Sequence, residues 1–183
     1  MGSEMCIRDS PRIIGALARL GVWIEKEARL PKVPSIGGGG PGALRVEWTS
    51  VGLPVQSAYE LESYTLQVGA EEALLQAQNP LGILRGLETF RQLVRTEGDV
   101  TTVRAAAIDD FPRFPWRGLL IDPSRRWQPV ENIKRTLDGM AAVKMNVLHW
   151  HLSDDQGFRL ESPKYPGLHG KGSDGLFLSL IHI

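Results

Sequence analysis

The apolar residues of this chain change their spacing several times, and each change predicts a different element. Over Pro11–Leu30 they recur at three- and four-residue intervals, which predicts an amphipathic helix. Residues 31–42 contain prolines and four consecutive glycines, which predict a loop or linker. Short apolar or alternating runs then predict strands over Ala43–Val51, Glu60–Val68 and Glu72–Ala77.

A second helix is expected directly after these strands. Asn79 suits an N-cap and Pro80 suits the first helical position, and the apolar stripe that follows predicts a helix to about Arg95. Thr101–Ile108 predicts a further strand. Strands around one strong helix predict a small α+β domain over residues 11–110.

Two prolines in the segment Asp109–Pro115 predict a boundary, with a second domain over residues 111–177. Gly118–Asp122 is a short apolar run, typical of a fully buried parallel strand. Pro129 can start an amphipathic helix, and Asn146–His151 predicts the next strand. This order predicts a β-α-β unit with parallel strands, and only two such strands fit the sequence, so the sheet is expected to be incomplete.

The composition argues against some classes of protein and identifies none. The 183 residues are 42% apolar, with 21 basic and 21 acidic side chains, which is ordinary for a globular protein. A formal net charge of zero gives no reason to expect nucleic acid or an anionic membrane as a partner. The chain has no run of 18 apolar residues, so we expect no transmembrane helix.

The two ends of the sequence look foreign to the rest. Met5–Ser10 can be back-translated as ATG TGT ATA AGA GAC AG, and Leu178–Ile183 as CTG TCT CTT ATA CAC ATC. These strings are reverse complements over nearly their whole length and resemble a sequencing-library adapter. We therefore expect residues 1–10 and 178–183 to be adapter-derived, and the native part to be cut at both ends. Cys6, the only cysteine, falls in the first of these segments, and any signal peptide would precede Pro11, so the residues do not indicate a compartment.

Polar residues gather after each strand of the predicted β-α-β unit. The first group is Asp122, Ser124, Arg125, Arg126 and Trp127, and the second is Ser153, Asp154, Asp155 and Gln156. Because working groups in such layouts follow the C-terminal ends of parallel strands, we expect the two groups to be neighbours. Guanidinium, carboxylate and indole groups together suit a polyhydroxylated ligand.

Each of these residues also has a simpler explanation. His149 and His151 lie on one side of the strand and could ligate a metal, but two ligands make an incomplete site, which favours hydrogen-bonded core histidines. Asp154 and Asp155 could cap a helix or face solvent, and Arg125 could be surface charge. The residues alone therefore predict an α/β carbohydrate-type site and no more.

Two longer motifs carry a family resemblance. Residues 117–125 (Arg-Gly-Leu-Leu-Ile-Asp-Pro-Ser-Arg) and 149–159 (His-Trp-His-Leu-Ser-Asp-Asp-Gln-Gly-Phe-Arg) resemble glycoside hydrolase family 20, the β-N-acetylhexosaminidases. The resemblance extends to residues 110–114 and 165–168, and less specifically to residues 64–66 and 86–93. It covers roughly residues 43–177.

The resemblance implies a fold and a reaction. The fold would be the family's small α+β domain followed by the first β-α-β portion of a TIM (β/α)8 barrel, truncated. The reaction would be retaining hydrolysis of terminal β-linked GlcNAc or GalNAc, in which the substrate's own 2-acetamido group replaces an enzymic nucleophile. No cofactor and no metal are implied, and the family is often periplasmic or secreted. The family's catalytic Glu and its adjacent orienting Asp are absent from this sequence, so these residues alone are expected to be inactive.

The motifs also imply roles for three residues. Arg125 resembles the arginine that binds the sugar's outer hydroxyls, and His151 a histidine that lines the pocket. Asp154 resembles the carboxylate that supports the catalytic Glu through a downstream histidine. Arg117 and Asp155 are expected to be structural. Arg126-Trp127 departs from the family, where a His and an aromatic residue are common at these positions.

Two alternatives from other classes stay open at this point. One is a non-catalytic sugar-binding protein that keeps Arg125 without the catalytic pair. The other is a metal-dependent hydrolase that uses His149 and His151.

Overall fold

The computed structural model describes residues 10–27, 42–53, 55, 57–98, 100–155 and 157–172. The chain divides into two compact units, Met1–Pro115 and Trp116–Ile183. The segments 1–9 and 178–183, which look adapter-derived, and the glycine-rich loop at 31–41 lie outside the described residues.

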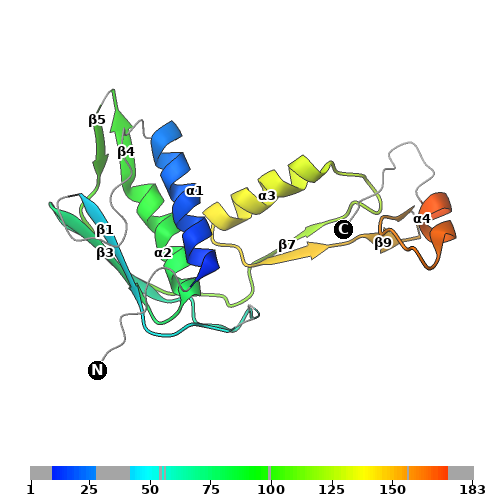
Figure 1. Ribbon diagram of the computed structural model, residues 1–183, viewed down its shortest axis with the longest axis horizontal. Helices are drawn as coiled ribbons and strands as arrows, with labels where there is room; N and C mark the ends of the chain where they lie inside the picture. The colour runs from blue at the N-terminus through cyan, green and yellow to red at the C-terminus, as the bar shows by residue number, and fades with distance from the viewer. Residues whose placement is uncertain are drawn as a thin grey trace. The chain divides into compact units, whose positions relative to one another are not determined.

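The first unit is built on a four-stranded sheet with the order β1-β3-β2-β6, of which Figure 1 labels β1 and β3. Its strands are β1 (Ala43–Trp48), β2 (Tyr64–Val68), β3 (Glu72–Ala77) and β6 (Ala106–Asp110). β1 and β3 are parallel, whereas β2 pairs antiparallel with both β3 and β6. Because side chains alternate along a strand, β2 buries Tyr64, Leu66 and Val68 and leaves the residues between them more exposed.

Two helices complete the core of this unit. The predicted first helix is confirmed as α1 (Pro11–Glu27), and α2 (Pro80–Leu93) packs on β2 and β3 with α1 beside it (Figure 1). Asn79 caps α2 as predicted: its Oδ1 accepts the backbone N–H groups of Leu81 at 2.9 Å and Gly82 at 3.3 Å. The apolar faces of both helices join the buried strand residues in one hydrophobic cluster.

Several boundaries differ from the sequence prediction. The strands predicted over Ala43–Val51 and Glu60–Val68 are shorter, because β1 ends at Trp48 and β2 begins at Tyr64. α2 ends at Leu93 rather than Arg95, because Val94–Glu97 forms β4 and pairs antiparallel with β5 (Val100–Val103). The single strand predicted over Thr101–Ile108 is wrong, because β5 belongs to this hairpin while β6 belongs to the main sheet. The backbone N–H of Arg104, between the two strands, donates to the carbonyl of Leu93.

The second unit contains the predicted β-α-β motif. β7 (Gly118–Ile121) and β8 (Val147–Trp150) are parallel, and α3 (Val130–Ala142) connects them. The chain then forms a short hairpin of β9 (Ser153–Asp154) and β10 (Gly157–Phe158), followed by α4 (Pro166–Gly172). The sequence patterns did not predict the hairpin or α4.

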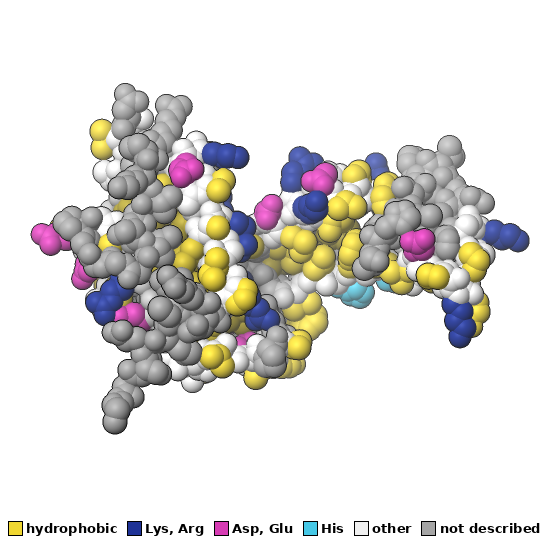
Figure 2. Space-filling model, in the orientation of Figure 1, with side chains coloured by type: hydrophobic (Ala, Val, Ile, Leu, Met, Phe, Trp, Pro, Cys, Tyr) yellow, Lys and Arg dark blue, Asp and Glu magenta, His cyan; other side chains and the backbone are white. Residues whose placement is uncertain are grey.

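The prediction that the first strand of this motif is fully buried is wrong. Leu119 is 37% exposed and Leu120 is 55% exposed in β7. The reason is that, among the described residues, β7 pairs only with β8. α3 buries Ile133 and Met140 but leaves Val130 and Leu137 exposed, and hydrophobic side chains are visible on the surface of this unit (Figure 2).

Within the described ranges, no helix combines the length and the apolar content needed to cross a bilayer.

Candidate functional site

The candidate site lies where β7 and β8 end. Asp122 directly follows β7, and Ser124 and Arg125 come from the turn beyond it. His151 directly follows β8, and Asp154 is the second residue of β9 in the hairpin that comes next. Because β7 and β8 are parallel and paired, their C-terminal ends place the two groups of side chains next to each other.

Arg125 joins the two loops through its guanidinium group. Its Nη1 lies 3.2 Å from Asp122 Oδ2, and its Nη2 lies 3.2 Å from Asp154 Oδ2. His151 Nε2 lies 2.8 Å from the same oxygen of Asp154. The structure thus brings together the three residues that the sequence singled out.

Asp122 also belongs to this cluster, although the sequence patterns gave it no individual role. Its Oδ1 accepts the Ser124 hydroxyl at 2.6 Å and the backbone N–H of Arg125 at 3.1 Å. A carboxylate that accepts N–H and O–H groups two and three residues later stabilises a tight turn. The spacing Asp-x-Ser-Arg is the signal in the sequence that could have identified this role.

The surroundings keep both carboxylates ionised. The hydrogen bond with His151, the backbone N–H of Asp155 and the charge of Arg125 together lower the pKa of Asp154 to about 2. The Ser124 hydroxyl, and then the backbone N–H and the charge of Arg125, lower the pKa of Asp122. The site therefore presents two fixed negative charges with one guanidinium between them.

Arg159 is a second residue to which the sequence patterns gave no individual role. Its side chain is fully buried, and its Nε and Nη2 donate to the backbone carbonyls of Pro123 and Ser124 at 2.9 Å each. A single arginine between Phe158 and Leu160 is a weak sequence signal for a buried, hydrogen-bonded guanidinium.

The two histidines lie on one side of β8, as strand alternation requires. Their ring centroids are 6.1 Å apart with planes inclined at 62°. The interpretation of both as core histidines is wrong for His149, which is exposed, whereas His151 is 33% exposed and contacts Asp154. Among the residues that the structure describes, no three or more His, Cys, Asp or Glu side chains form a group that could hold a metal ion.

The residues expected to be structural make backbone contacts. Arg117 Nε donates to the Lys144 carbonyl at 2.8 Å, and its backbone N–H donates to Asn146 Oδ1 at 2.9 Å. These bonds join the start of β7 to the start of β8. Asp155 contributes its backbone N–H to Asp154 Oδ1 at 2.8 Å, while its side chain is exposed.

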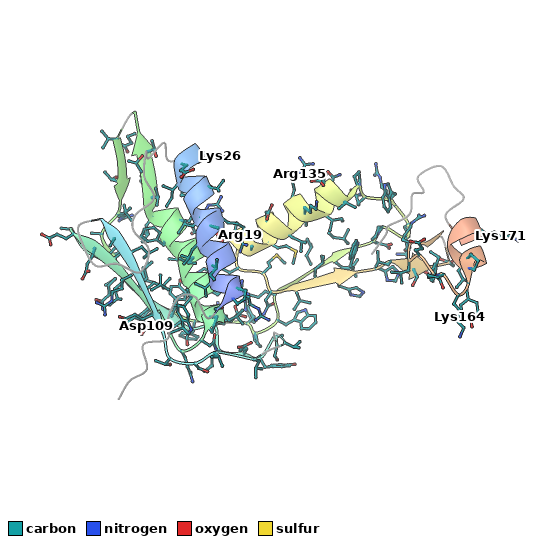
Figure 3. The ribbon with its side chains drawn as sticks, viewed as in Figure 1. Arg19, Lys26, Asp109, Arg135, Lys164 and Lys171 are labelled. Atoms are coloured by element: carbon teal, nitrogen blue, oxygen red, sulfur yellow. The ribbon has the colours of Figure 1, made fainter. Side chains whose placement is uncertain are left out.

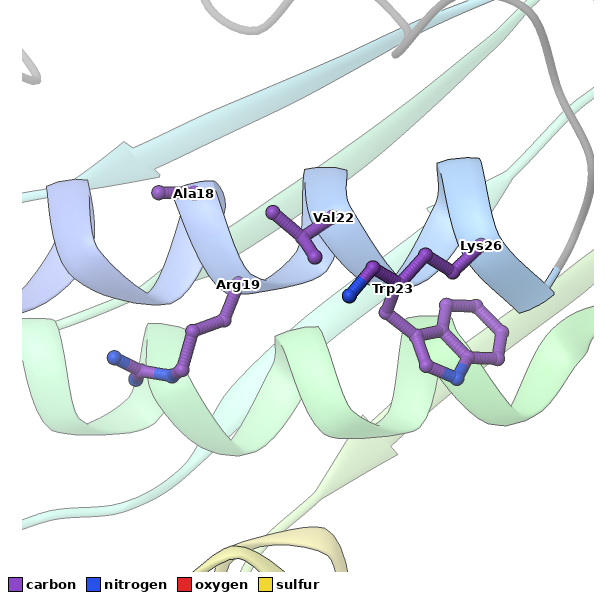
Figure 4. Close-up of a pocket in the computed structure, with 5 residues that line it drawn as sticks. All are labelled: Ala18, Arg19, Val22, Trp23 and Lys26. Atoms are coloured by element: carbon purple, nitrogen blue, oxygen red, sulfur yellow. The ribbon is translucent and has the colours of Figure 1, made fainter.

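The structure also has exposed cations and a pocket that are formed by residues outside this cluster. In the second unit, Arg135 on α3 and Lys164 and Lys171 near α4 carry exposed cations (Figure 3). In the first unit, a hollow of about 400 Å³ lies along α1 (Figure 4). Its lining among the described residues is Ala18, Arg19, Val22, Trp23 and Lys26, which includes no carboxylate.

Two family descriptions match the chain. Residues 114–178 match "Glycosyl hydrolase family 20, catalytic domain", and residues 46–93 match "beta-acetyl hexosaminidase like". The chain belongs to glycosyl hydrolase family 20. The family resemblance in the two long motifs is confirmed.

Relatives in family 20 match over much of this chain but over little of their own length. The β-subunit of β-hexosaminidase from Rattus norvegicus is 53% identical over 123 residues, which are 67% of this chain and 22% of the relative. The human β-subunit is 52% identical over 123 residues, 67% of this chain and 21% of the relative. The chain thus spans about a fifth of the length of these curated relatives.

Solved structures of family 20 share the fold. A chitobiase from Flavobacterium johnsoniae aligns with a TM-score of 0.75 and 39% identity over 92% of this chain and 26% of the other. A Streptomyces plicatus β-hexosaminidase in complex with its product GlcNAc aligns with a TM-score of 0.69 and 28% identity, over 90% of this chain and 33% of the other.

Proposed function

We propose that this chain is part of a retaining β-N-acetylhexosaminidase that hydrolyses terminal β-linked GlcNAc or GalNAc by substrate-assisted catalysis. The observation that carries the proposal is the contact among Arg125, Asp154 and His151 at the ends of two adjacent parallel strands, in a member of family 20. In this proposal β7, α3 and β8 open a TIM barrel, whose C-terminal face holds the active site.

Arg125 would bind the outer hydroxyls of the sugar. Its side chain is 62% exposed although it contacts two carboxylates, so part of the guanidinium faces outward. A guanidinium has five N–H donors in a planar fork, and such a fork can donate to two neighbouring oxygens at once. Asp122 and Asp154 orient that fork from one side.

His151 would line the pocket beside Arg125. Its Nε2 contacts Asp154, and its side chain is partly exposed. The carbohydrate would therefore meet a cationic fork and an imidazole held by a common carboxylate.

Asp154 would act on the reaction through other groups. Its carboxylate is ionised and is fixed by Arg125, His151 and the N–H of Asp155. In the family's arrangement, such a carboxylate holds a downstream histidine that in turn orients the catalytic Glu. A fixed anion at that position keeps the histidine in one tautomer, which is a common way to hold a catalytic group in orientation.

The remaining chemistry needs residues that this sequence does not contain. The acetamido oxygen of the substrate attacks the anomeric carbon while a Glu protonates the leaving oxygen, and the same Glu then accepts a proton from the attacking water. The 183 residues contain no Asp-Glu dipeptide. We therefore propose that these residues alone do not hydrolyse the substrate.

The test uses the protein encoded with its downstream sequence and p-nitrophenyl N-acetyl-β-glucosaminide as substrate. Loss of a hydrogen bond to a charged group is worth ~1.5–3 kcal/mol, so Arg125→Ala should raise KM by about 10- to 100-fold. Asp154→Asn should mainly lower kcat, because the lost negative charge supports the catalytic acid, and it should raise KM less than Arg125→Ala does, because Asp154 also orients Arg125. Arg135→Ala, which removes an exposed arginine from α3, is the matched control and should change neither constant.

Normal kinetics in both site variants would contradict these assignments. GlcNAc binding by the longer protein without hydrolysis would instead support a sugar-binding protein that lacks catalysis.

A further inference from the structure

We propose that Arg159 is a positioning residue that fixes the place of Arg125 by holding the two peptide carbonyls immediately before it. The effect of this residue on catalysis rests on the proposed function. The contacts that support it are independent of that function.

The contacts run from the hairpin after β8 to the turn after β7. Arg159 Nε donates to the Pro123 carbonyl and Nη2 donates to the Ser124 carbonyl, both at 2.9 Å. These carbonyls belong to the two residues that precede Arg125. A planar guanidinium that binds two successive carbonyls restrains both peptide planes, and so the direction in which the next residue leaves the turn.

The contact between Arg159 and the turn is buried away from solvent. Arg159 is 0% exposed, and so is Ser124. Burial lowers the pKa of Arg159, which expresses the cost of holding a cation away from water. Carbonyl oxygens compensate that cost in part, while Nη1 has no hydrogen-bond partner among the described residues. Among the described residues no carboxylate forms an ion pair with Arg159. Burying a guanidinium in this way costs free energy that an apolar residue of similar size would not cost, so packing alone does not account for an arginine here.

Gly157 makes room for the guanidinium. A Cβ at this position would lie 2.6 Å from the Ser124 carbonyl oxygen and 2.8 Å from Arg159 Nη2, closer than real Cβ contacts. A side chain here would push the arginine and the turn apart. Gly157 and Arg159 are thus both needed for the contact with the Ser124 carbonyl.

The same contact couples the two halves of the site. The backbone N–H of Arg159 donates to the Leu152 carbonyl at 2.8 Å, and the N–H of Ser124 donates to the His151 carbonyl at 3.3 Å. The turn that carries Arg125 and the hairpin that carries Asp154 are therefore joined at several points. Arg159 reaches from the hairpin side to the turn, as Arg125 reaches from the turn to the hairpin, and we infer that Arg159 maintains the 3.2 Å contact between Arg125 and Asp154.

The first experiment is a double-mutant cycle in the protein with its downstream sequence. Arg159→Met keeps an apolar stem and removes the donors, and it should raise KM for p-nitrophenyl N-acetyl-β-glucosaminide by about tenfold with little change in kcat. Adding Arg125→Ala to Arg159→Met should raise KM no further than Arg125→Ala alone, because both act through one group. If the increases in KM of the two single variants multiply in the double variant, the proposal is overturned. An Arg159→Met variant with unchanged KM would overturn it as well.

Two further variants serve in case Arg159→Met does not fold. Arg159→Lys keeps the charge but loses the planar fork that fixes the directions of two successive carbonyls, so it should give a KM between those of the wild type and Arg159→Met. Gly157→Ala keeps the arginine and displaces it, and it should raise KM in the same non-additive way with Arg125→Ala. Wild-type constants in both variants would overturn the proposal.

The second experiment needs no activity and uses the 183-residue chain. Hydrogen exchange at the amides of Ser124 and Arg125 should accelerate in Arg159→Lys, whereas the amide of Leu148 within β8 should keep its rate. Unchanged rates at Ser124 and Arg125 would overturn the positioning role. If the longer wild-type protein does not hydrolyse the substrate, the proposed function fails, and the exchange rates still decide whether Arg159 holds the turn.

Discussion

At the scale of single residues, the site depends on one carboxylate oxygen that serves two partners. Asp154 Oδ2 contacts both Arg125 and His151, while Oδ1 accepts the backbone N–H of Asp155. All these contacts favour the ionised form, with the hydrogen bond from His151 contributing most. The low pKa of Asp154 is therefore set by its neighbours and should rise when one of them is removed.

The pKa of Asp154 provides a direct check. It is lowered from 3.8 to about 2, so the stabilisation from this carboxylate is complete above pH 3.8 and is lost as the pH falls through about 2. His151→Ala removes the largest cause and should raise the pKa of Asp154 toward its usual value. Carbon-13 NMR of the side-chain carboxyl, followed against pH in the 183-residue chain, measures it.

His149→Ala is the matched control for this titration. His149 is an exposed histidine on the same side of β8 whose ring contacts His151. This variant should leave the titration midpoint of Asp154 low. A wild-type midpoint near 3.8 would show that the three-residue contact does not form in solution.

The residues of the site were predictable to different degrees. Arg125 and Asp154 belong to the polar groups that follow the two strand ends, and parallel strands bring such positions together, so the sequence pattern placed them side by side. His151 was singled out only by the family resemblance, which also implied the roles of all three residues. Arg159 was not predictable in this way, because its partners are backbone carbonyls 35 and 36 residues away. Carbonyl groups occur at every residue, so no sequence pattern marks which of them a buried arginine will bind.

At the scale of elements, periodicity located helices and strands but not the way they pair. The pattern at Thr101–Ile108 has the composition of one strand, yet it divides between a hairpin and the main sheet. Gly98, with φ of 61°, permits the turn that pairs β4 with β5. Pairing depends on which partner is adjacent in space, and a local pattern does not contain that information.

Two glycines in helices should respond in opposite ways to the same substitution. A Cβ at Gly86 of α2 would lie 2.2 Å from Leu75 Cδ1, so Gly86→Ala should destabilise the first unit by ~1–3 kcal/mol through overpacking. A Cβ at Gly139 of α3 would meet nothing within 4 Å. Gly139→Ala should stabilise its helix by ~0.5–1 kcal/mol, because alanine loses less backbone entropy.

Native-state hydrogen exchange measures both changes separately. The amide of Phe90 reports on α2, and the amide of Met140 reports on α3. Equal effects of the two substitutions would contradict the close packing of α2 on β3.

At the scale of the whole molecule, the two units bury their apolar residues to different extents. The first unit has a cluster that joins α1, α2 and the sheet. In the second unit the buried apolar residues include Ile133 and Met140, while Trp116, Leu120 and Val143 are 63%, 55% and 68% exposed. The β-α-β pattern was predictable from sequence, but the exposure of its strands was not, because burial depends on the neighbours that a strand finds.

This difference predicts that the 183-residue chain associates with itself through its second unit. Leu120 pairs in register with His149 on the side of β7 that carries the site, so a lysine there would place a charge on an exposed apolar surface. Leu120→Lys should lower both the mass measured by light scattering and the fluorescence of a bound hydrophobic dye. Val51→Lys, which changes a residue 71% exposed in the first unit, should leave both unchanged. Because both substitutions add the same charge, a fall in association with Val51→Lys alone, or equally with the two, would place the associating surface elsewhere.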